Sequence, residues 1–226
     1  MGTQKLLIAI DGPAGVGKSS AGKAVALKYG LSFLSTGEMY RCLGWKALQL
    51  GLPLDDDERV CAAAKAINWG FERLPDSSLK ILIDGVYLGD KLLADDIGQA
   101  ASKTSALPKA RAVITEKQKQ MALEGGLVME GRDIGTIIAP FAKVKIYLTA
   151  TAEVRAERRV LQLKEKGQSA NYDELLASIK ARDERDSNRK TAPLKPAADA
   201  VIIDTSALNL ERVILKITEL VDERSL

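Results

Sequence analysis

The 226-residue sequence contains no histidine. This absence excludes Ser-His-Asp triads, histidine-based acid catalysis and histidine zinc sites. Any chemistry must therefore depend on lysine, arginine, carboxylates, hydroxyls, the backbone or a metal ion.

The sequence also has few cysteines and no long apolar run. Cys42 and Cys61 are the only two cysteines, and we expect both to be free thiols, as suits a reducing compartment. No apolar run approaches the about 20 residues that a membrane span needs. Residues 1–11 lack the basic start, apolar stretch and cleavage site of a signal peptide. We therefore expect a cytoplasmic protein without a membrane partner.

The charge balance is close to neutral, with a formal net charge of +3. That balance does not favour a nucleic-acid partner, and we expect none. The arginines are nevertheless unevenly distributed. Six of them gather near the C-terminal third of the chain: Arg155, Arg158, Arg159, Arg182, Arg185 and Arg189.

Strand-like and helix-like segments alternate along the chain, which predicts an α/β fold with a parallel sheet covered on both faces. The predicted buried strands are 5–10, 32–34, 127–130, 144–148 and 200–204. The predicted helices are 18–29, 38–50, 55–66, 95–102, 108–124, 152–166, 172–188 and 208–223. We expect Asp55 to cap the third of these in a capping box with Glu58. Residues 67–93, with a hairpin signal at Asp84-Gly85, predict a small antiparallel insert beside the main sheet.

A phosphate-binding motif lies between the first predicted strand and the first predicted helix. Residues 12–19 match G-x-x-x-x-G-K-[ST] without a mismatch. Glycines let backbone N–H groups turn toward phosphate oxygens, and the helix N-terminus adds positive potential. We expect Lys18 to reach the β- and γ-phosphates and Ser19 to bind Mg²⁺. The predicted ATP site consists of Gly12, Pro13, Ala14, Gly15, Val16, Gly17, Lys18, Ser19 and Ser20.

The phosphate loop alone does not separate kinases from GTPases or motor ATPases. A GTPase would also need an N-K-x-D motif, and the nearest string, residues 188–191, lacks the aspartate. In a motor ATPase an apolar strand would end in paired acids, whereas Glu130 is followed by Gly131-Arg132-Asp133. Because ligands of open α/β sheets sit at the carboxyl ends of strands, that string suits a second-substrate site better.

The arginine-rich helices predict a lid over the phosphates. Arg155, Arg158 and Arg159 have the i, i+3, i+4 spacing of one helix face, and the stripe from Arg182 to Arg189 repeats that spacing. Phosphoryl transfer needs such cations around the moving group, and an acceptor that is itself a phosphate monoester needs no strong base. The alternative is two solvated helices whose charges pair with neighbouring acids.

Several motifs together resemble the bacterial cytidylate kinase family. They are residues 10–19 (IDGPAGVGKS), 36–41 (TGEMYR), 130–136 (EGRDIGT), 182–189 (RDERDSNR), 192–194 (APL) and 198–200 (ADA). The phosphate loop is shared widely, whereas EGRDIGT combined with R-D-x-x-D-x-x-R-x-x-A-P-L is much more specific. The resemblance implies transfer of the γ-phosphate of ATP to CMP or dCMP, with Mg²⁺ as cofactor.

The resemblance also implies an architecture. We expect a P-loop kinase unit with a five-stranded parallel sheet flanked by helices, a small antiparallel β insert and a helical lid. The core would comprise residues 1–51, 104–151 and 191–226, the acceptor-binding insert 52–103 and the lid 152–190. We expect a monomer, because no heptad seam is present.

The resemblance to the family also implies roles for individual residues in substrate binding and catalysis. Thr36 and Arg41 would bind the acceptor, with Arg41 on its phosphate. The readers of the cytosine edge would be Ser102, Arg111 and Asp133. The sugar contacts would be Arg182 and Asp186. The catalytic cations would be Lys18, Arg132, Arg159 and Arg189, with Arg132 also on the acceptor's phosphate.

The sequence departs from the family at three places. Ser35 stands where the family usually has aspartate, Glu38 where it has a small residue, and residues 139–141 replace an aromatic-Pro-Asp string. Two alternatives stay open at this point. One is a kinase for UMP, AMP or shikimate; the other is a nucleotide-binding switch protein, with a purely structural protein the weakest possibility.

Overall fold

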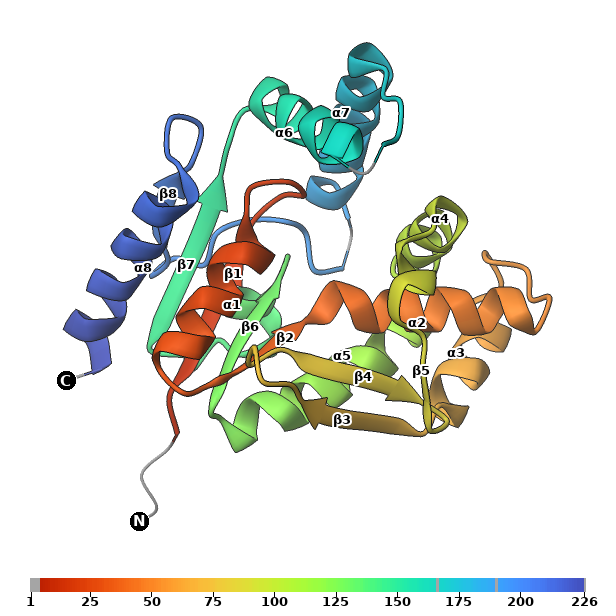
Figure 1. The fold of residues 1–226 in the computed structure, drawn as a ribbon. Helices are drawn as coiled ribbons and strands as arrows, with labels where there is room; N and C mark the ends of the chain where they lie inside the picture. The colour runs from red at the N-terminus through yellow and green to blue at the C-terminus, as the bar shows by residue number, and fades with distance from the viewer. Residues whose placement is uncertain (1–4, 166, 190, 226) are drawn as a thin grey trace.

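The computed structural model describes residues 5–165, 167–189 and 191–225. Its centre is a five-stranded parallel sheet in the order β2-β6-β1-β7-β8 (Figure 1). The strands are β1 (Leu7–Asp11), β2 (Ser32–Ser35), β6 (Leu127–Gly131), β7 (Val144–Thr149) and β8 (Val201–Asp204). The predicted fold class and all five predicted core strands are therefore confirmed.

The sheet is covered on both faces, and every residue of the central strands β1 and β6 is buried. The α-helices of the described residues are α1 (Lys18–Lys28), α2 (Thr36–Gln49), α3 (Asp57–Ala66), α4 (Asp95–Thr104), α5 (Pro108–Glu124), α6 (Ala152–Glu165), α7 (Tyr172–Ser187) and α8 (Leu210–Ser225). Successive residues of β1 point to opposite faces. Ile8 and Ile10 pack with α1 and α8, whereas Leu7 and Ala9 pack with α2, α3 and α5.

A second, three-stranded antiparallel sheet lies beside β2, as predicted (Figure 1). Its strands are β3 (Trp69–Arg73), β4 (Leu79–Ile83) and β5 (Val86–Tyr87). Asp84 and Gly85 both have positive φ, 53° and 79°, which is the conformation of a tight two-residue hairpin. Ile81 and Ile83 are buried in the cluster that holds α2 and α3, so the small sheet shares the core.

The start of α3 corrects one prediction. Asp56, not Asp55, is the N-cap: its Oδ1 accepts a hydrogen bond from the Arg59 N–H at 3.1 Å, and no capping box with Glu58 forms. Asp57 has a different task, because its carboxylate accepts from the N–H groups of Lys109 and Ala110, both at 3.0 Å. The register of α3 is thus set by the first turn of α5, fifty residues away in sequence.

Two short turns were not predicted. Gly89–Leu93 forms a 3₁₀ turn after β5, and Ile134–Ile138 forms a π-helical turn after β6. Helices α6 and α7 form a hairpin above the carboxyl end of β7, joined through Gly167, whose φ is 70° (Figure 1). The predicted end of the first lid helix at residue 166 lies outside the described residues.

Candidate active site

The phosphate loop follows β1 and leads into α1. Gly12 has a φ of 144°, and a Cβ there would lie 2.1 Å from the Leu148 carbonyl oxygen, so only glycine fits. The Lys18 ammonium is buried and donates to the Pro13 carbonyl at 2.6 Å. Burial, followed by repulsion from Arg132, lowers the pKa of Lys18 from 10.5 to about 7. An incoming triphosphate would supply the negative charge that this buried ammonium lacks.

Glu130 joins the phosphate loop to the end of the sheet. Its buried carboxylate accepts two hydrogen bonds on the same oxygen, Oε1, from the Ser19 hydroxyl at 2.9 Å and the Ser35 hydroxyl at 2.7 Å. The Thr36 hydroxyl donates to the Glu130 carbonyl at 2.8 Å. The ends of β2 and β6 and the start of α1 are thus held together by one residue.

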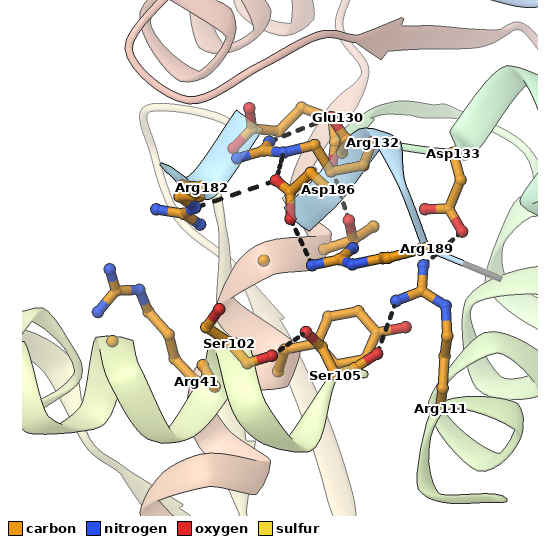
Figure 2. Close-up of a pocket in the computed structure, with 16 residues that line it drawn as sticks. Arg41, Ser102, Ser105, Arg111, Glu130, Arg132, Asp133, Arg182, Asp186 and Arg189 are labelled. Atoms are coloured by element: carbon orange, nitrogen blue, oxygen red, sulfur yellow. Dashed lines mark hydrogen bonds and ion pairs between the residues drawn. The ribbon is translucent and has the colours of Figure 1, made fainter. Parts of the chain in front are cut away.

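A pocket opens next to this junction (Figure 2). It is formed by α2, α4, the start of α5, the end of β6 and the last turns of α7. Its lining residues are Thr36, Gly37, Tyr40, Arg41, Gly98, Ala101, Ser102, Ser105, Arg111, Glu130, Gly131, Arg132, Asp133, Arg182, Asp186 and Arg189.

A buried ion pair lies at one end of the pocket (Figure 2). Arg111 Nη2 and Asp133 Oδ2 are 2.6 Å apart, and both side chains are buried. Arg111 Nη1 also donates to the Ser105 carbonyl at 3.1 Å, and the guanidinium lies 5.3 Å from the Tyr40 ring centroid. Within the described part of the chain, the Tyr40 hydroxyl and Arg111 Nε are buried and have no hydrogen-bond partner. Since buried polar atoms are normally paired, these two atoms indicate a ligand-binding surface.

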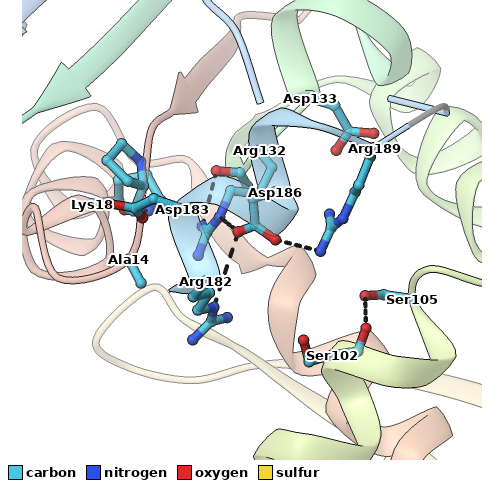
Figure 3. Close-up of polar contacts among 12 residues, drawn as sticks. Ala14, Lys18, Ser102, Ser105, Arg132, Asp133, Arg182, Asp183, Asp186 and Arg189 are labelled. Carbon is cyan, nitrogen blue, oxygen red and sulfur yellow. Dashed lines mark hydrogen bonds and ion pairs between the residues drawn. The ribbon is translucent and has the colours of Figure 1, made fainter. Parts of the chain in front are cut away.

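Asp186 organises the arginines at the other end of the pocket (Figure 3). Its carboxylate lies 3.0 Å from Arg132 Nε, 2.5 Å from Arg189 Nη2 and 4.0 Å from Arg182 Nε. Burial favours the neutral acid, but Arg132 and Arg189 more than offset it, so the pKa of Asp186 is lowered. Three guanidinium groups facing one carboxylate leave an excess of positive charge for an anionic ligand.

Arg41 stands across the pocket from this cluster (Figure 2). Its Nη1 donates to the Leu92 carbonyl at 2.6 Å. A Cβ on Gly98 would lie 3.4 Å from both terminal nitrogens, so glycine leaves room for the guanidinium. Burial, followed by repulsion from Arg159, lowers the pKa of Arg41.

The three predicted lid arginines on α6 do not share one environment. Arg155 is buried: it donates to the Ala14 carbonyl of the phosphate loop at 3.2 Å and pairs with Asp183 of α7 at 2.5 Å. Arg158 turns away and donates to the carbonyl of Thr205 at 2.6 Å. Arg159 is exposed and is not among the residues lining the pocket. The predicted common face therefore does not bring the three guanidiniums to one partner: Arg155 contacts Ala14, and Arg158 contacts Thr205, whose hydroxyl donates to the Val16 carbonyl at 3.3 Å.

The oxygen donors suited to a magnesium ion are the Ser19 hydroxyl and the Glu130 carboxylate, 2.9 Å apart. Hard cations prefer such oxygen ligands. Among the described residues, no group of three or more His, Cys, Asp or Glu side chains forms a metal site by itself. A metal ion here would therefore complete its coordination with phosphate oxygens and water.

The sequence model of the family described as cytidylate kinase matches residues 8–223. The chain belongs to the cytidylate kinase family. It is 43% identical to a cytidylate kinase of Pasteurella multocida, over 94% of this chain and 93% of that one. It is 40% identical to a cytidylate kinase of Rhodococcus opacus, over 100% and 98% of the two chains. The resemblance inferred from the motifs is confirmed.

A comparison of structures supports the fold alone. An uncharacterised protein of Eubacterium ventriosum matches with a TM-score of 0.53 at 13% sequence identity, over 97% of this chain and 99% of that one. Among the described residues, none of the helices combines the length and apolar character that crossing a bilayer requires.

The structure brings the predicted acceptor residues of this cytidylate kinase family member into one pocket. Nine predicted site residues line it, namely the eight predicted to bind the acceptor and the predicted catalytic cation Arg189: Thr36, Arg41, Ser102, Arg111, Arg132, Asp133, Arg182, Asp186 and Arg189. Glu38 does not line it, and burial raises the pKa of its carboxyl.

Sequence reasoning gave no role to three residues at this site. Tyr40 and Glu130 lie inside the motifs TGEMYR and EGRDIGT, so motif membership could have identified them. Ser105 acts through a carbonyl contact that only the folded chain creates, as does the ion pair by which the predicted lid residue Arg155 contacts Asp183.

Proposed function

We propose that the protein transfers the γ-phosphate of ATP to CMP or dCMP, giving ADP and CDP or dCDP. The observation that carries this proposal is the pocket beside the phosphate loop. It has a buried Arg111–Asp133 pair at one end and the arginine cluster around Asp186 at the other. A neutral base with hydrogen-bonding edges suits the first end, and a phosphate monoester suits the second.

The donor site in this proposal is the phosphate loop with Ser20. Backbone N–H groups of residues 12–19 bind the triphosphate, and Lys18 places its charge on the β- and γ-phosphates. Ser19, with Glu130 behind it, holds Mg²⁺, which when bound neutralises charge on those phosphates. The glycine conformations at Gly12, Gly15 and Gly17, all with positive φ, support this assignment.

The acceptor site receives the other assignments. Ser102, Arg111 and Asp133 read the cytosine edge, Arg182 and Asp186 bind the sugar, and Thr36 and Arg41 hold the acceptor. Arg132 and Arg189 place their charges on the acceptor phosphate and the moving phosphoryl group. Arg159 joins them when the lid closes, since its charge already reaches Arg41.

These assignments divide the chain into three parts. We assign 1–51, 104–151 and 191–226 to the core, 52–103 to the acceptor-binding insert and 152–190 to a lid. The protein would act as a monomer in the cytoplasm on small nucleotides and would bind neither nucleic acid nor a membrane. Light scattering during size-exclusion chromatography tests the oligomeric state.

The decisive experiment is a coupled ADP-release assay with ATP and Mg²⁺. CMP, dCMP, UMP, AMP, GMP and shikimate are offered separately at the same concentration. The proposal expects strong turnover with CMP and dCMP. Preference for another acceptor would overturn the cytosine assignments, and ATP turnover that ignores every acceptor would overturn the kinase assignment.

A further inference from the structure

The π-helical turn Ile134–Ile138 directly follows Arg132 and Asp133, two residues of the pocket. The turn is closed by its own backbone at one end: the N–H groups of Ile137 and Ile138 donate to the Asp133 carbonyl at 2.9 and 3.2 Å. At the other end, the first N–H groups of a helical turn have no partner within it. The turn therefore needs an external acceptor.

Asp11 supplies that acceptor from β1. Its Oδ1 accepts from the Ile134 N–H at 2.8 Å and its Oδ2 from the Gly135 N–H at 2.7 Å. The Asp11 side chain is 3% exposed, so these bonds are shielded from water. A Cβ on Gly135 would lie 3.4 Å from Asp11 Oδ2 and 3.3 Å from Lys145, so glycine allows the close approach of the carboxylate.

Asp11 also precedes Gly12, the first residue of the phosphate loop. In the sheet it is the register partner of Gly131, and β1 lies between β6 and β7. One residue is thus covalently joined to the donor loop and hydrogen-bonded to the loop that carries Arg132 and Asp133.

We propose that Asp11 is a positioning residue that couples the two substrate sites, by fixing the loop of Arg132 and Asp133 relative to the phosphate loop. This inference rests on the proposed function for its kinetic consequence. A buried carboxylate that accepts two amides sets both the distance and the orientation of the turn. Phosphoryl transfer depends on in-line placement, and displacement of about 1 Å can lower a rate about 100-fold.

The Asp11→Asn variant tests the coupling. Asparagine keeps the shape of the side chain but offers one acceptor and one donor group, so one of the two amides loses its partner. We expect kcat/KM for CMP to fall about 10- to 100-fold. The ATP dissociation constant, measured without acceptor by calorimetry, should stay within about twofold, because Gly12 and the loop glycines are unchanged.

Asp204→Asn is the matched control. Asp204 ends β8 at the same edge of the sheet, but it is exposed and accepts from the Ser206 N–H at 2.8 Å rather than from a turn of the pocket. Its replacement should leave both substrate sites unchanged. Equal losses of ATP binding and CMP turnover in folded Asp11→Asn would overturn the proposal, since a general structural role predicts that result.

A measurement on the unmodified protein covers the case in which the variant does not fold. Burial raises the pKa of Asp11 to about 6, although the bonds from Gly135 and Ile134 oppose that rise. The charged or titratable groups facing it are Asp133, Lys18, Lys145 and Tyr147. In NMR spectra between pH 5 and 8, the amide protons of residues 134 and 135 should titrate with the Asp11 carboxyl carbon.

If the amide chemical shifts of residues 134 and 135 did not change with the ionisation of the Asp11 carboxyl, the proposed hydrogen bonds from the turn to Asp11 would be contradicted. This measurement is independent of activity. If the unmodified protein showed no CMP-dependent turnover, the proposed function would fail, whereas the NMR result would still decide whether Asp11 holds the turn.

Discussion

The phosphate loop and the acceptor pocket are built on opposite principles. The loop is one contiguous segment, and its shape follows from glycines at Gly12, Gly15 and Gly17 with φ values of 144°, 82° and 92°. The pocket collects side chains from segments between residues 36 and 189 and holds them with ion pairs. The backbone conformation therefore restricts which substitutions the loop tolerates, whereas the ion pairs restrict which substitutions the pocket tolerates.

This difference also separates the two sites electrostatically. In the loop, the buried Lys18 ammonium donates to a backbone carbonyl, that of Pro13, and forms no ion pair with another described residue. In the pocket, the Asp133 carboxylate contacts one guanidinium, and the Asp186 carboxylate contacts more than one. Removing a pocket residue should therefore disturb its partner as well, while the loop should respond to single changes in isolation.

The largest expected effect is that of Gly12→Ala on stability. The positive φ and the 2.1 Å approach to the Leu148 carbonyl together should cost about 4 kcal/mol. Gly17→Ala is the matched control, since its φ is also positive but no atom lies within 4 Å of its Cβ position. It should cost about 1–2 kcal/mol, for backbone strain alone. Urea unfolding measures both, and equal costs would contradict the steric argument.

Lys18→Ala should lower kcat about 100- to 1,000-fold with every acceptor. The reason is that its charge serves the transferred phosphoryl group, which is common to all acceptors. The KM for CMP should change little, because Lys18 does not line the pocket. ADP release at saturating ATP measures this, and retained turnover would mean that the phosphate-loop assignment is wrong.

Asp133→Asn should affect the pocket and spare the loop. The change leaves the buried Arg111 guanidinium without its countercharge, which should cost about 3 kcal/mol of stability. The KM for CMP should rise about tenfold, and preference for CMP over UMP should fall, with the KM for ATP nearly unchanged.

Glu153→Gln is its control, because the Glu153–Lys180 pair, at 2.9 Å, is exposed on the lid. That variant should behave like the unmodified protein. Equal losses for CMP and UMP in Asp133→Asn would count against Asp133 as a reader of the base.

The smallest effect concerns pH and ATP binding. Above pH 7 the free protein holds Lys18 largely neutral, since burial and Arg132 lower its pKa to about 7. Triphosphate favours the ammonium form, so binding takes up a proton and ATP affinity should weaken as pH rises from 7.5 to 9. The ATP dissociation constant should rise by at most about tenfold per pH unit, as expected for the uptake of one proton.

Calorimetry in two buffers of different ionisation enthalpy measures the proton uptake. Lys18→Arg should abolish the pH dependence, because a guanidinium stays protonated throughout this range. Proton uptake that persists in Lys18→Arg would assign it to another group.

Most elements could be predicted because their signals are local. The helix Pro108–Glu124 has the predicted bounds, since proline starts it and two glycines follow it. The cap of α3 was misplaced by one residue, because three consecutive aspartates offer the same local signal. Only the contact of Asp57 with the start of α5 decides among them.

The candidate site also has a part that could be predicted from the sequence and a part that could not. The glycine and lysine spacing named the phosphate loop, and the family resemblance named the nine predicted residues that line the pocket, of which Ser102 and Arg111 lie outside the motifs. They did not separate Arg155, Arg158 and Arg159, whose helical spacing is compatible with one face. Carbonyl groups of Ala14 and Thr205, far away in sequence, bind Arg155 and Arg158 and leave Arg159 exposed.

By itself the sequence determined the α/β class, the strand–loop–helix that binds phosphate, and the set of charged residues available for transfer. Periodicity and glycine conformation are properties of neighbouring residues, so they can be read along the chain. Only the tertiary structure decided which charges meet. Asp186 gathers arginines from two segments, and Asp11 reaches the turn after Asp133 across more than a hundred residues. The Asp11 contact arises from the order of strands, which places β1 next to β6, and no local pattern encodes that order.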